Sequence, residues 1–242
     1  MDICITGASS GIGKELATQL IKNNHRVWGI ARNKDLLEGL KNGLSSDNFY
    51  YTASDASKRE EVFSAFQDME KNKFFPEIII LAAGVFLDDI NPVFNYGILQ
   101  KNIDTNLYGA MNFVDIFLPK FLKRKSGQFI AISSTAALKP SLRGIGYPAS
   151  KAALGIAFRG LDLAYRKQNI FFSVIYLGPV ATRMWDAKKS FIVSDTKQIA
   201  SAIKKVMRAK KAVYYIPFWS TLISRLSFLP DSWYIALTEL FR

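Results

Sequence analysis

The chain of 242 residues has one cysteine, Cys4, and one histidine, His25. One cysteine cannot form an internal disulfide bond, and so few thiol and imidazole groups argue against a metal site. No stretch reaches the 18 or more consecutive apolar residues of a membrane-spanning helix. A Pro/Gly/Ser-rich linker and internal repeats are also missing. We therefore expect a cytoplasmic protein, without a metal site, that folds as a single domain over residues 1–242.

Acidic residues are scarce: 20 Asp and Glu face 32 Lys and Arg, which gives a net charge of +12. The excess is uneven, because residues 183–211 contain nine basic and two acidic residues. Such a charge favours an anionic ligand, an anionic membrane surface or nucleic acid as partner. No nucleic-acid-binding motif is present, so we expect no nucleic-acid partner.

Short apolar runs alternate with helical patterns along the chain. The expected strands are Asp2–Thr6, Arg26–Ile30, Phe49–Ala53, Glu77–Leu81, Gln128–Ser133, Ile170–Tyr176 and Val213–Ile216. The expected helices run from the first glycines to about Asn23, then over Asp35–Lys41, Ser57–Asn72, Asn95–Lys123, Pro148–Lys167 and Asp195–Ala209. This alternation predicts an α/β fold: a three-layer, doubly wound, Rossmann-like parallel sheet of about seven strands with helices on both faces.

A glycine-rich segment, Thr6–Gly13, links the first strand to the first helix. Its glycines allow a tight turn and close backbone approach to a pyrophosphate, which the helix N-terminus also attracts. The spacing G-x-x-x-G-x-G differs from the common G-x-G-x-x-G fingerprint, and a turn without a ligand is the alternative. The candidate cofactor-binding residues here are Gly7, Ser9, Ser10, Gly11, Ile12 and Gly13.

The second strand ends at Ala31-Arg32, where an acidic residue would bind the ribose 2′-hydroxyl of NAD. An arginine accepts a 2′-phosphate instead, so Arg32 favours NADP(H) over NAD(H). The alternative is an arginine that is merely on the surface.

Tyr147 and Lys151 are four residues apart at the start of a predicted helix, so both lie on one face. A nearby ammonium stabilises the phenolate and lowers the pKa of tyrosine toward the range useful for acid–base catalysis. Ser134, at the end of the fifth predicted strand, offers a hydroxyl to a substrate oxygen. A surface Tyr–Lys pair is the alternative, which the position after this strand disfavours.

These motifs together resemble the short-chain dehydrogenase/reductase family in its compact single-domain form. The resemblance covers about residues 1–182 and also includes Asp55-Ala56, Ala83-Gly84, Asn106 and the segment Gly178-Pro179-Val180-Ala181-Thr182. Two departures stand out. Leu81-Ala82-Ala83-Gly84 replaces Asn-Asn-Ala-Gly, which implies looser positioning of the adenosine half, and Leu177-Gly178 replaces Pro-Gly.

The resemblance implies a role for each matching residue. Tyr147 would be the acid/base, Lys151 would hold the nicotinamide ribose and lower the pKa of Tyr147, and Ser134 would polarise the carbonyl. Asn106 would hold a water molecule in the proton supply. The remaining cofactor contacts would come from Asp55, Ala56, Ala83, Gly84, Gly178, Val180 and Thr182. Family members also form dimers or tetramers, so the resemblance implies a homo-oligomer.

After Thr182, residues 183–193 correspond to a variable substrate loop, and residues 217–242 form an apolar C-terminal extension. The extension is interpreted as core or dimer surface, as a lid over a lipophilic substrate, or as a peripheral membrane contact. We expect an NAD(P)(H)-dependent oxidoreductase, with NADPH favoured, that interconverts a carbonyl and a secondary alcohol on a lipophilic small molecule. The alternatives are an inactive NADP(H)-sensing protein and a binder of anionic surfaces through residues 183–242.

Overall fold

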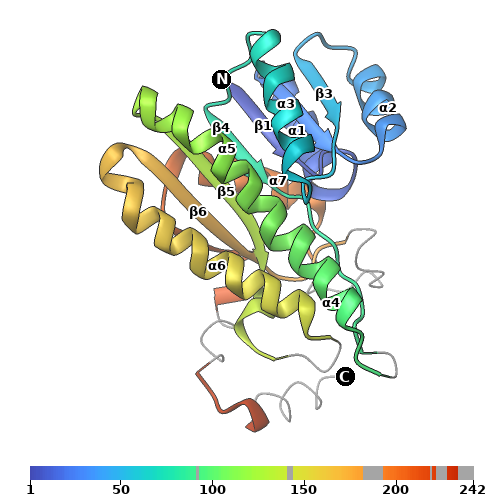
Figure 1. Ribbon diagram of the computed structural model, residues 1–242, viewed down its shortest axis with the longest axis vertical. Coiled ribbons are helices and arrows are strands. Elements are labelled where there is room, and N and C mark those ends of the chain that lie inside the picture. The colour runs from blue at the N-terminus through green and yellow to red at the C-terminus, as the bar shows by residue number, and fades with distance from the viewer. Residues whose placement is uncertain (91–92, 141–143, 182–192, 219, 222–227, 234–242) are drawn as a thin grey trace.

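A computed structural model describes residues 1–90, 93–140, 144–181, 193–218, 220–221 and 228–233. Within them, seven parallel strands form one sheet in the order β3-β2-β1-β4-β5-β6-β7. The strands are β1 Asp2–Thr6, β2 Arg26–Ala31, β3 Phe49–Ala53, β4 Ile78–Leu81, β5 Gly127–Ser134, β6 Ile170–Leu177 and β7 Val213–Ile216. The expected parallel α/β sheet is therefore confirmed (Figure 1).

The helices are α1 Gly11–Lys22, α2 Lys34–Leu44, α3 Arg59–Lys71, α4 Tyr96–Ile103, α5 Gly109–Arg124, α6 Gly146–Tyr165 and α7 Thr196–Ala209. Side chains that favour helix N-termini begin three of them: Asn33, Asn95 and Asp195 accept a backbone N–H in the first turn of α2, α4 and α7. Helix positions are thus set partly by local capping and partly by the apolar face that each helix buries.

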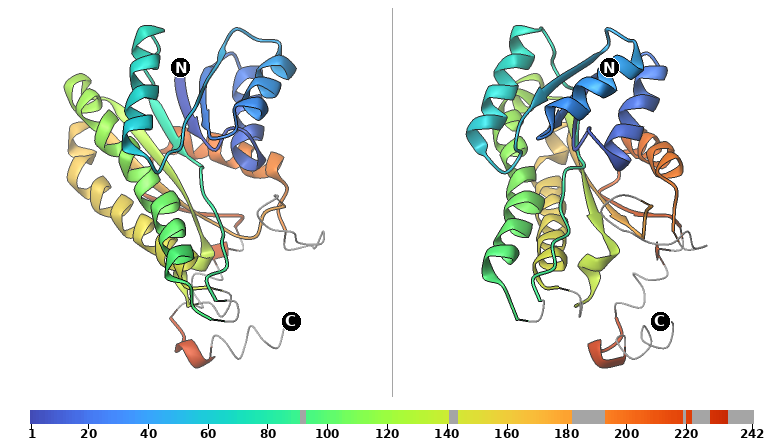
Figure 2. Two further views of the ribbon diagram at one scale, coloured as in Figure 1. Left: turned by 45° about the vertical axis from the view of Figure 1, so that its right-hand side comes forward. Right: turned by 90° about the vertical axis from the view of Figure 1, so that its right-hand side faces the viewer.

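The helices cover both faces of the sheet (Figure 2). One hydrophobic cluster lies between the sheet and α3, α5 and α6, and contains Phe113, Phe117 and Phe158. The other lies beneath α1, α2 and α7, and contains Leu16, Leu37 and Ile203. Because both faces are covered, the strands are apolar along their whole length, which explains the continuous apolar runs in the sequence.

The helix expected over Asn95–Lys123 differs from the structure. A π-helical turn, Asp104–Tyr108, separates α4 from α5. An i→i+5 turn widens the helix locally, and such turns are common at functional sites. Asn106 lies in this turn and is buried.

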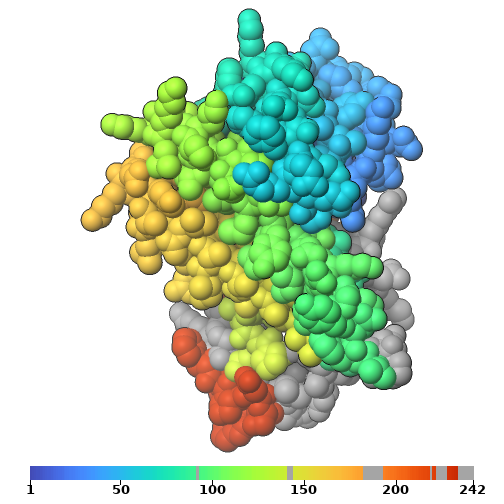
Figure 3. Space-filling view, in the orientation of Figure 1, coloured from blue at the N-terminus to red at the C-terminus, as the bar shows by residue number. Residues whose placement is uncertain are grey.

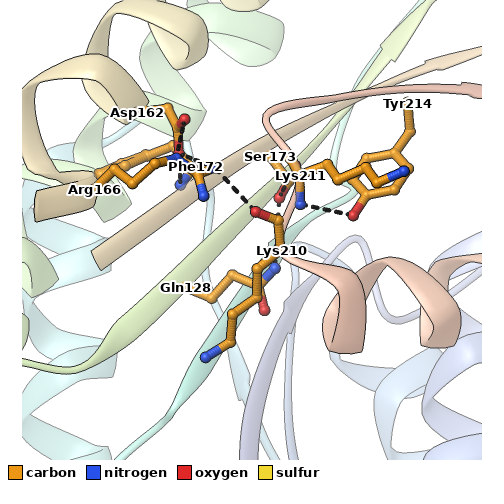
Figure 4. A network of polar contacts seen from close by, with 8 residues as sticks. All are labelled: Gln128, Asp162, Arg166, Phe172, Ser173, Lys210, Lys211 and Tyr214. Atoms are coloured by element: carbon orange, nitrogen blue, oxygen red, sulfur yellow. Dashed lines mark hydrogen bonds and ion pairs between the residues drawn. The ribbon is translucent and has the colours of Figure 1, made fainter. Parts of the chain in front are cut away.

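A polar network lies at the amino ends of the strands (Figure 4). This edge of the sheet is opposite the one that carries the glycine-rich turn and the predicted catalytic residues. Arg166 makes two hydrogen bonds to the carboxylate of Asp162 and donates another to the Lys210 carbonyl, 2.9 Å away. Asp162 also accepts from the Phe172 amide at 3.1 Å. These bonds join the end of α6 to β6 and to the turn between α7 and β7. Lys210 and Lys211 therefore lie at the end of the sheet that is away from the carboxyl ends of the strands.

Candidate active site

The strand order reverses between β1 and β4, because β2 and β3 lie on one side of β1 and β4 to β7 lie on the other. In open α/β sheets, ligands bind beyond the carboxyl ends of the strands at such a reversal. The loops after β1, β4, β5 and β6 all emerge at this edge, and they carry the motifs that the sequence analysis selected.

The glycine-rich turn after β1 has the shape that a pyrophosphate requires. Gly7 has φ +71°, and a Cβ there would lie 2.9 Å from the Ala83 amide nitrogen. A Cβ at Gly13 would collide with the Gly7 carbonyl oxygen. Within the described chain, the side chain of N-cap Ser10 makes no capping hydrogen bond, so the first amides of α1 remain available to an anion. Ser9, Ser10, Gly11 and Ile12 form the rest of this turn, and the residues present therefore fit a dinucleotide phosphate.

Arg32 follows β2 directly and is exposed. Asp55 and Ala56 follow β3 at the same edge of the sheet. The carboxylate of Asp55 accepts the amide and the hydroxyl of Ser57, at 3.0 and 2.8 Å, which fixes its direction. The structure thus brings the three residues predicted for the adenosine half of the cofactor to neighbouring strand ends.

The segment after β4, which has Leu81-Ala82 where the family has two asparagines, is bonded to the end of β1. The Ala83 amide donates to the Thr6 hydroxyl at 3.0 Å, which ties the ends of β4 and β1 together. A Cβ at Gly84 would lie 2.9 Å from Asn106 Oδ1 and 3.2 Å from Lys151 Nζ. Only a glycine at this position leaves room for the lysine ammonium beside the asparagine.

Ser134, Tyr147 and Lys151 meet at the carboxyl end of β5. Tyr147 is in the first turn of α6, where Ser134 makes a side-chain hydrogen bond with it. Lys151, one turn further, lies with Nζ 5.9 Å from the centre of the tyrosine ring. The ammonium donates to the Ile132 carbonyl at 2.9 Å, and the lysine side chain is buried. The structure therefore brings together the predicted catalytic residues.

Burial dominates the pKa values of this cluster. It lowers the pKa of Lys151 to about 8 and raises the pKa of Tyr147. The hydrogen bond with Ser134 opposes the shift of Tyr147. Lys151 Nζ lies 5.9 Å from the centre of the Tyr147 ring, and a lowering of the Tyr147 pKa by this ammonium stays a prediction.

Asn106 in the π-helical turn is fully engaged. Its amide nitrogen donates to the Val85 carbonyl at 2.9 Å and to Ser150 Oγ at 3.0 Å, and its Oδ1 accepts the Val85 amide at 2.8 Å. Ser150 in turn donates to the Tyr147 carbonyl at 2.7 Å. The asparagine side chain thereby links the loop after β4 to the helix that carries the tyrosine.

The segment after β6 completes the edge. The Gly178 amide donates to the Ile216 carbonyl at 2.9 Å, and Val180 is buried and pairs with Ser194. Thr182 and residues 183–192 of the predicted substrate loop lie outside the described residues.

Three residues at this site escaped the sequence analysis: Phe86, Asp89 and Asn102. The ring of Phe86 packs edge to face on Tyr147. Asp89 and Asn102 are buried polar residues that bind main-chain groups near the start of α6 and in the loop after β4. Buried Asp and Asn side chains are rare and therefore informative, but their burial becomes apparent only from the structure. The sequence thus contains no signal for these residues.

Among the residues that the structure describes, no group of three or more His, Cys, Asp or Glu side chains is suited to a metal ion. None of the helices in the described part of the chain is long and apolar enough to cross a membrane.

Comparison with known proteins agrees with this geometry. The model of a protein family described as short chain dehydrogenase matches residues 2–192. An uncharacterized oxidoreductase of Staphylococcus aureus is 30% identical over 178 residues, which are 74% of this chain and 77% of the relative. Serine dehydrogenase in its closed form with NADP⁺ superposes with a TM-score of 0.82 at 21% identity, over 89% of this chain and 94% of that one.

A bulky-bulky ketone specific alcohol dehydrogenase from Comamonas testosteroni superposes with a TM-score of 0.78 at 18% identity, over 99% of this chain and 92% of its own. At such identities the two solved structures show that the fold is shared. The family match, the oxidoreductase relative and a glycine turn shaped for a dinucleotide identify the same kind of protein. The chain belongs to the short-chain dehydrogenase family and is an NAD(P)-dependent oxidoreductase that acts on CH–OH and C=O groups.

Proposed function

We propose that this protein reduces the carbonyl group of a lipophilic small molecule to a secondary alcohol, with NADPH as the favoured cofactor. The observation that carries the proposal is the cluster of Ser134, Tyr147 and Lys151 at the carboxyl end of β5, beside the glycine turn after β1. When bound, the reduced nicotinamide supplies the hydride that reaches the carbonyl carbon.

Tyr147 is the proton donor in this proposal. Burial raises its pKa, so the phenol keeps its proton at neutral pH and has it to give to the carbonyl oxygen as charge develops there. Ser134, which already bonds the phenol, donates its own hydrogen bond to the same substrate oxygen. Both groups come from rigid elements, the end of β5 and the first turn of α6, so their geometry is set before substrate arrives.

Lys151 and Asn106 support the proton supply. The ammonium of Lys151 is available for the ribose hydroxyls because Gly84 leaves the space beside it open. The pKa of about 8 leaves Lys151 mostly protonated at neutral pH. Asn106 has its side chain committed to Val85 and Ser150, and we assign the water-holding role to the main chain of its π-helical turn, where the regular i→i+4 bonding is interrupted.

Cofactor contacts are assigned to the turn Gly7, Ser9, Ser10, Gly11, Ile12 and Gly13, and to Arg32, Asp55, Ala56, Ala83, Gly84, Gly178, Val180 and Thr182. The NADPH preference depends on Arg32, which is exposed at the end of β2. The residues on either side of it in the sequence, Ala31 and Asn33, are not acidic.

A lipophilic substrate is supported by apolar side chains at the carboxyl end of the strands. Phe86 contacts Tyr147, and Ile145, Phe228 and Trp233 are exposed at this end. Lys139, a few residues after Ser134, bonds Asp231 and the Leu229 carbonyl, each at 2.6 Å. This anchors the described part of the C-terminal extension beside the site, where Figure 3 shows it at one end of the molecule. The similarity to a ketone-specific dehydrogenase agrees with such a substrate.

Self-association is a further part of the proposal. Ile156 and Leu163 are 65% and 84% exposed and lie seven residues apart on α6, so one face of this helix presents two large aliphatic side chains. Family members associate through the equivalent helices, and we propose a homo-oligomer that buries this face.

The test is NADPH oxidation with a panel of small and bulky ketones, comparing wild type with Tyr147→Phe. The variant should lose about 10²- to 10⁴-fold in kcat, the usual share of a general acid, while binding NADPH as well as wild type does. Tyr96→Phe, which alters an exposed tyrosine at the start of α4, should match wild type. If no carbonyl or alcohol reacts with either nicotinamide, and Tyr147→Phe is equally inert, the proposed activity is wrong; binding of NADPH without turnover would then indicate an NADP(H)-sensing protein.

A further inference from the structure

The helix that carries Tyr147 and Lys151 begins on a buried carboxylate. Asp89 is 1% exposed, and its two oxygens accept the backbone amides of Ile145 and Gly146 at 2.7 and 2.5 Å. The N-cap of α6 is Ile145, an apolar residue that cannot cap the helix itself. The capping oxygens therefore come from a residue 56 positions earlier in the chain.

Two glycines make room for this carboxylate. Gly144 has φ +146°, and a Cβ there would lie 2.8 Å from Asp89 Oδ1. A Cβ at Gly146 would lie 2.8 Å from Asp89 Oδ2 and 3.0 Å from the Leu99 Cα. Any side chain at either position would displace the carboxylate, so the start of α6 fits closely around Asp89.

Asp89 is itself held in place by α4 and the π-helical turn. Residues Val85–Asp89, which we call the strap, follow β4. Asn106 binds both main-chain groups of Val85, and Asn102 binds both main-chain groups of Leu87. The Asp89 carbonyl accepts the Asn95 amide at 2.8 Å. Val85, Leu87 and Asp89 of the strap are thus each held by hydrogen bonds, and the Asp89 side chain in turn holds the start of α6.

We propose that Asp89 is a positioning residue for the carbonyl reduction proposed above, and the inference rests on that function. By fixing the first amides of α6 against the strap, Asp89 sets where Tyr147, the residue after Gly146, stands relative to Ser134 and Lys151. Ser134 and Lys151 have their own anchors, in β5 and in the bond to Ile132. A loose helix start therefore moves Tyr147 while leaving its partners in place, and a displacement of 1 Å can cost about 10²-fold in rate.

The test compares Asp89→Ala and Asp89→Asn with Asp88→Ala as the matched control. Asp88 is the exposed neighbour, and among the described residues its carboxylate accepts a local bond from the Ile90 amide, at 3.0 Å. Asp89→Ala should lower kcat about 30- to 100-fold with NADPH affinity within about twofold of wild type, because the phosphate turn is on β1 and α1. Asp89→Asn keeps one acceptor oxygen and should recover part of the loss. Asp88→Ala should match wild type.

Hydrogen–deuterium exchange gives a readout that does not depend on activity. Residues 144–151 should exchange faster in Asp89→Ala than in wild type or Asp88→Ala, while residues 127–134 of β5 stay protected. If wild type reduces no carbonyl, the proposed function is wrong, and this exchange pattern alone decides the positioning role. Unchanged exchange in Asp89→Ala, or a kcat equal to that of Asp88→Ala, would overturn it.

A second variant covers the case in which Asp89→Ala does not fold. Gly146→Ala keeps Asp89 and pushes its Oδ2 away from the helix start. It should show the same loss in kcat at constant NADPH affinity, and the same faster exchange over residues 144–151. Wild-type behaviour of Gly146→Ala in both measurements would count against the role of Asp89.

Discussion

The ring of Phe86 meets the ring of Tyr147 edge to face, with centroids 5.0 Å apart and planes 89° apart. Phe86 belongs to the segment after β4, and Tyr147 belongs to the first turn of α6. This contact joins the segment after β4 to the start of α6. It also gives the proposed substrate pocket an aromatic wall next to its proton donor.

Phe86→Ala should lower kcat/KM about three- to tenfold for every ketone that wild type reduces. An edge-to-face aromatic pair contributes about 0.5–1.5 kcal/mol beyond area burial, and its loss frees the Tyr147 ring to leave its productive orientation. Because the substitution also enlarges the pocket, the loss should be smaller for bulky ketones than for small ones. Steady-state kinetics across the ketone panel measures both effects.

Phe94→Ala is the control for this prediction, because Phe94 is a half-exposed phenylalanine in the same connection between β4 and α4. It should leave the ranking of small and bulky ketones unchanged. Equal kinetics for Phe86→Ala and Phe94→Ala would show that the ring contact has no role in turnover.

Lys151 should reduce the stability of the protein at neutral pH. Burial lowers its pKa to about 8 from an ordinary value of 10.5, and at about 1.4 kcal/mol per pKa unit this corresponds to a penalty of about 3 kcal/mol. Below pH 8 both the folded and unfolded chains carry the proton, so the full penalty applies. Between pH 8 and about 10.5 only the unfolded chain holds it, so this contribution to stability improves as the pH rises.

Lys151→Met removes the buried charge and keeps the length of the side chain. The variant should be more stable than wild type at pH 7 by about 1–2 kcal/mol, since the lost bond to the Ile132 carbonyl offsets about 1 kcal/mol of the gain. Its advantage should shrink toward pH 10. Urea unfolding at pH 7, 8.5 and 10 measures this, with Lys167→Met as a variant of an exposed lysine. An advantage that grows with pH would contradict the assignment.

The sheet could be predicted from the sequence because both of its faces are covered. Covered strands leave continuous apolar runs such as Ile78–Leu81, and β1, β3 and β7 have the bounds expected from their patterns. The helices were predictable for a similar local reason: Asn95 and Asp195 cap the helices that follow them. Each of these signals depends on residues that are neighbours in the chain.

The details that shape the site depend on distant contacts. The π-helical turn around Asn106 interrupts a stretch whose apolar pattern predicts one continuous helix. Asp89 caps a helix that begins 57 positions later, and a lone Asp in a loop gives no sign of such a partner. Spacing and strand position indicated Ser134, Tyr147 and Lys151, and the family resemblance added Asn106. The residues that hold them in place became visible only when the loop after β4 and α6 were brought together.

The basic charge also gains a physical explanation from the fold. In a doubly wound sheet all helices end near the amino ends of the strands, and α1, α3, α5 and α7 each have Lys or Arg in their last turn. Such residues stabilise the negative end of the helix dipole. Part of the late basic segment, including Arg208 and Lys210, belongs to this set, and it lies at the end of the sheet opposite the site. The proposed binding of the dinucleotide by Arg32 and the α1 N-terminus therefore does not depend on this part of the charge.

Arg32→Asp should reverse the cofactor preference. Replacing the cation removes a charge-assisted bond to the 2′-phosphate, worth about 1.5–3 kcal/mol, and should lower kcat/KM for NADPH about 10- to 100-fold. The new carboxylate at the end of β2 is suited to the ribose 2′-hydroxyl and should improve kcat/KM for NADH. Kinetics with both cofactors measure the change.

The control is Lys34→Asp, which makes the same change of charge on an exposed residue two positions later, at the start of α2. If long-range electrostatics alone governed NADPH binding, the two variants would lose affinity together, and both losses relative to wild type would shrink at high salt, where the charges are screened. A direct contact predicts instead that only Arg32→Asp changes the ratio of NADPH to NADH efficiency. An unchanged ratio in Arg32→Asp would show that another part of the chain selects the cofactor.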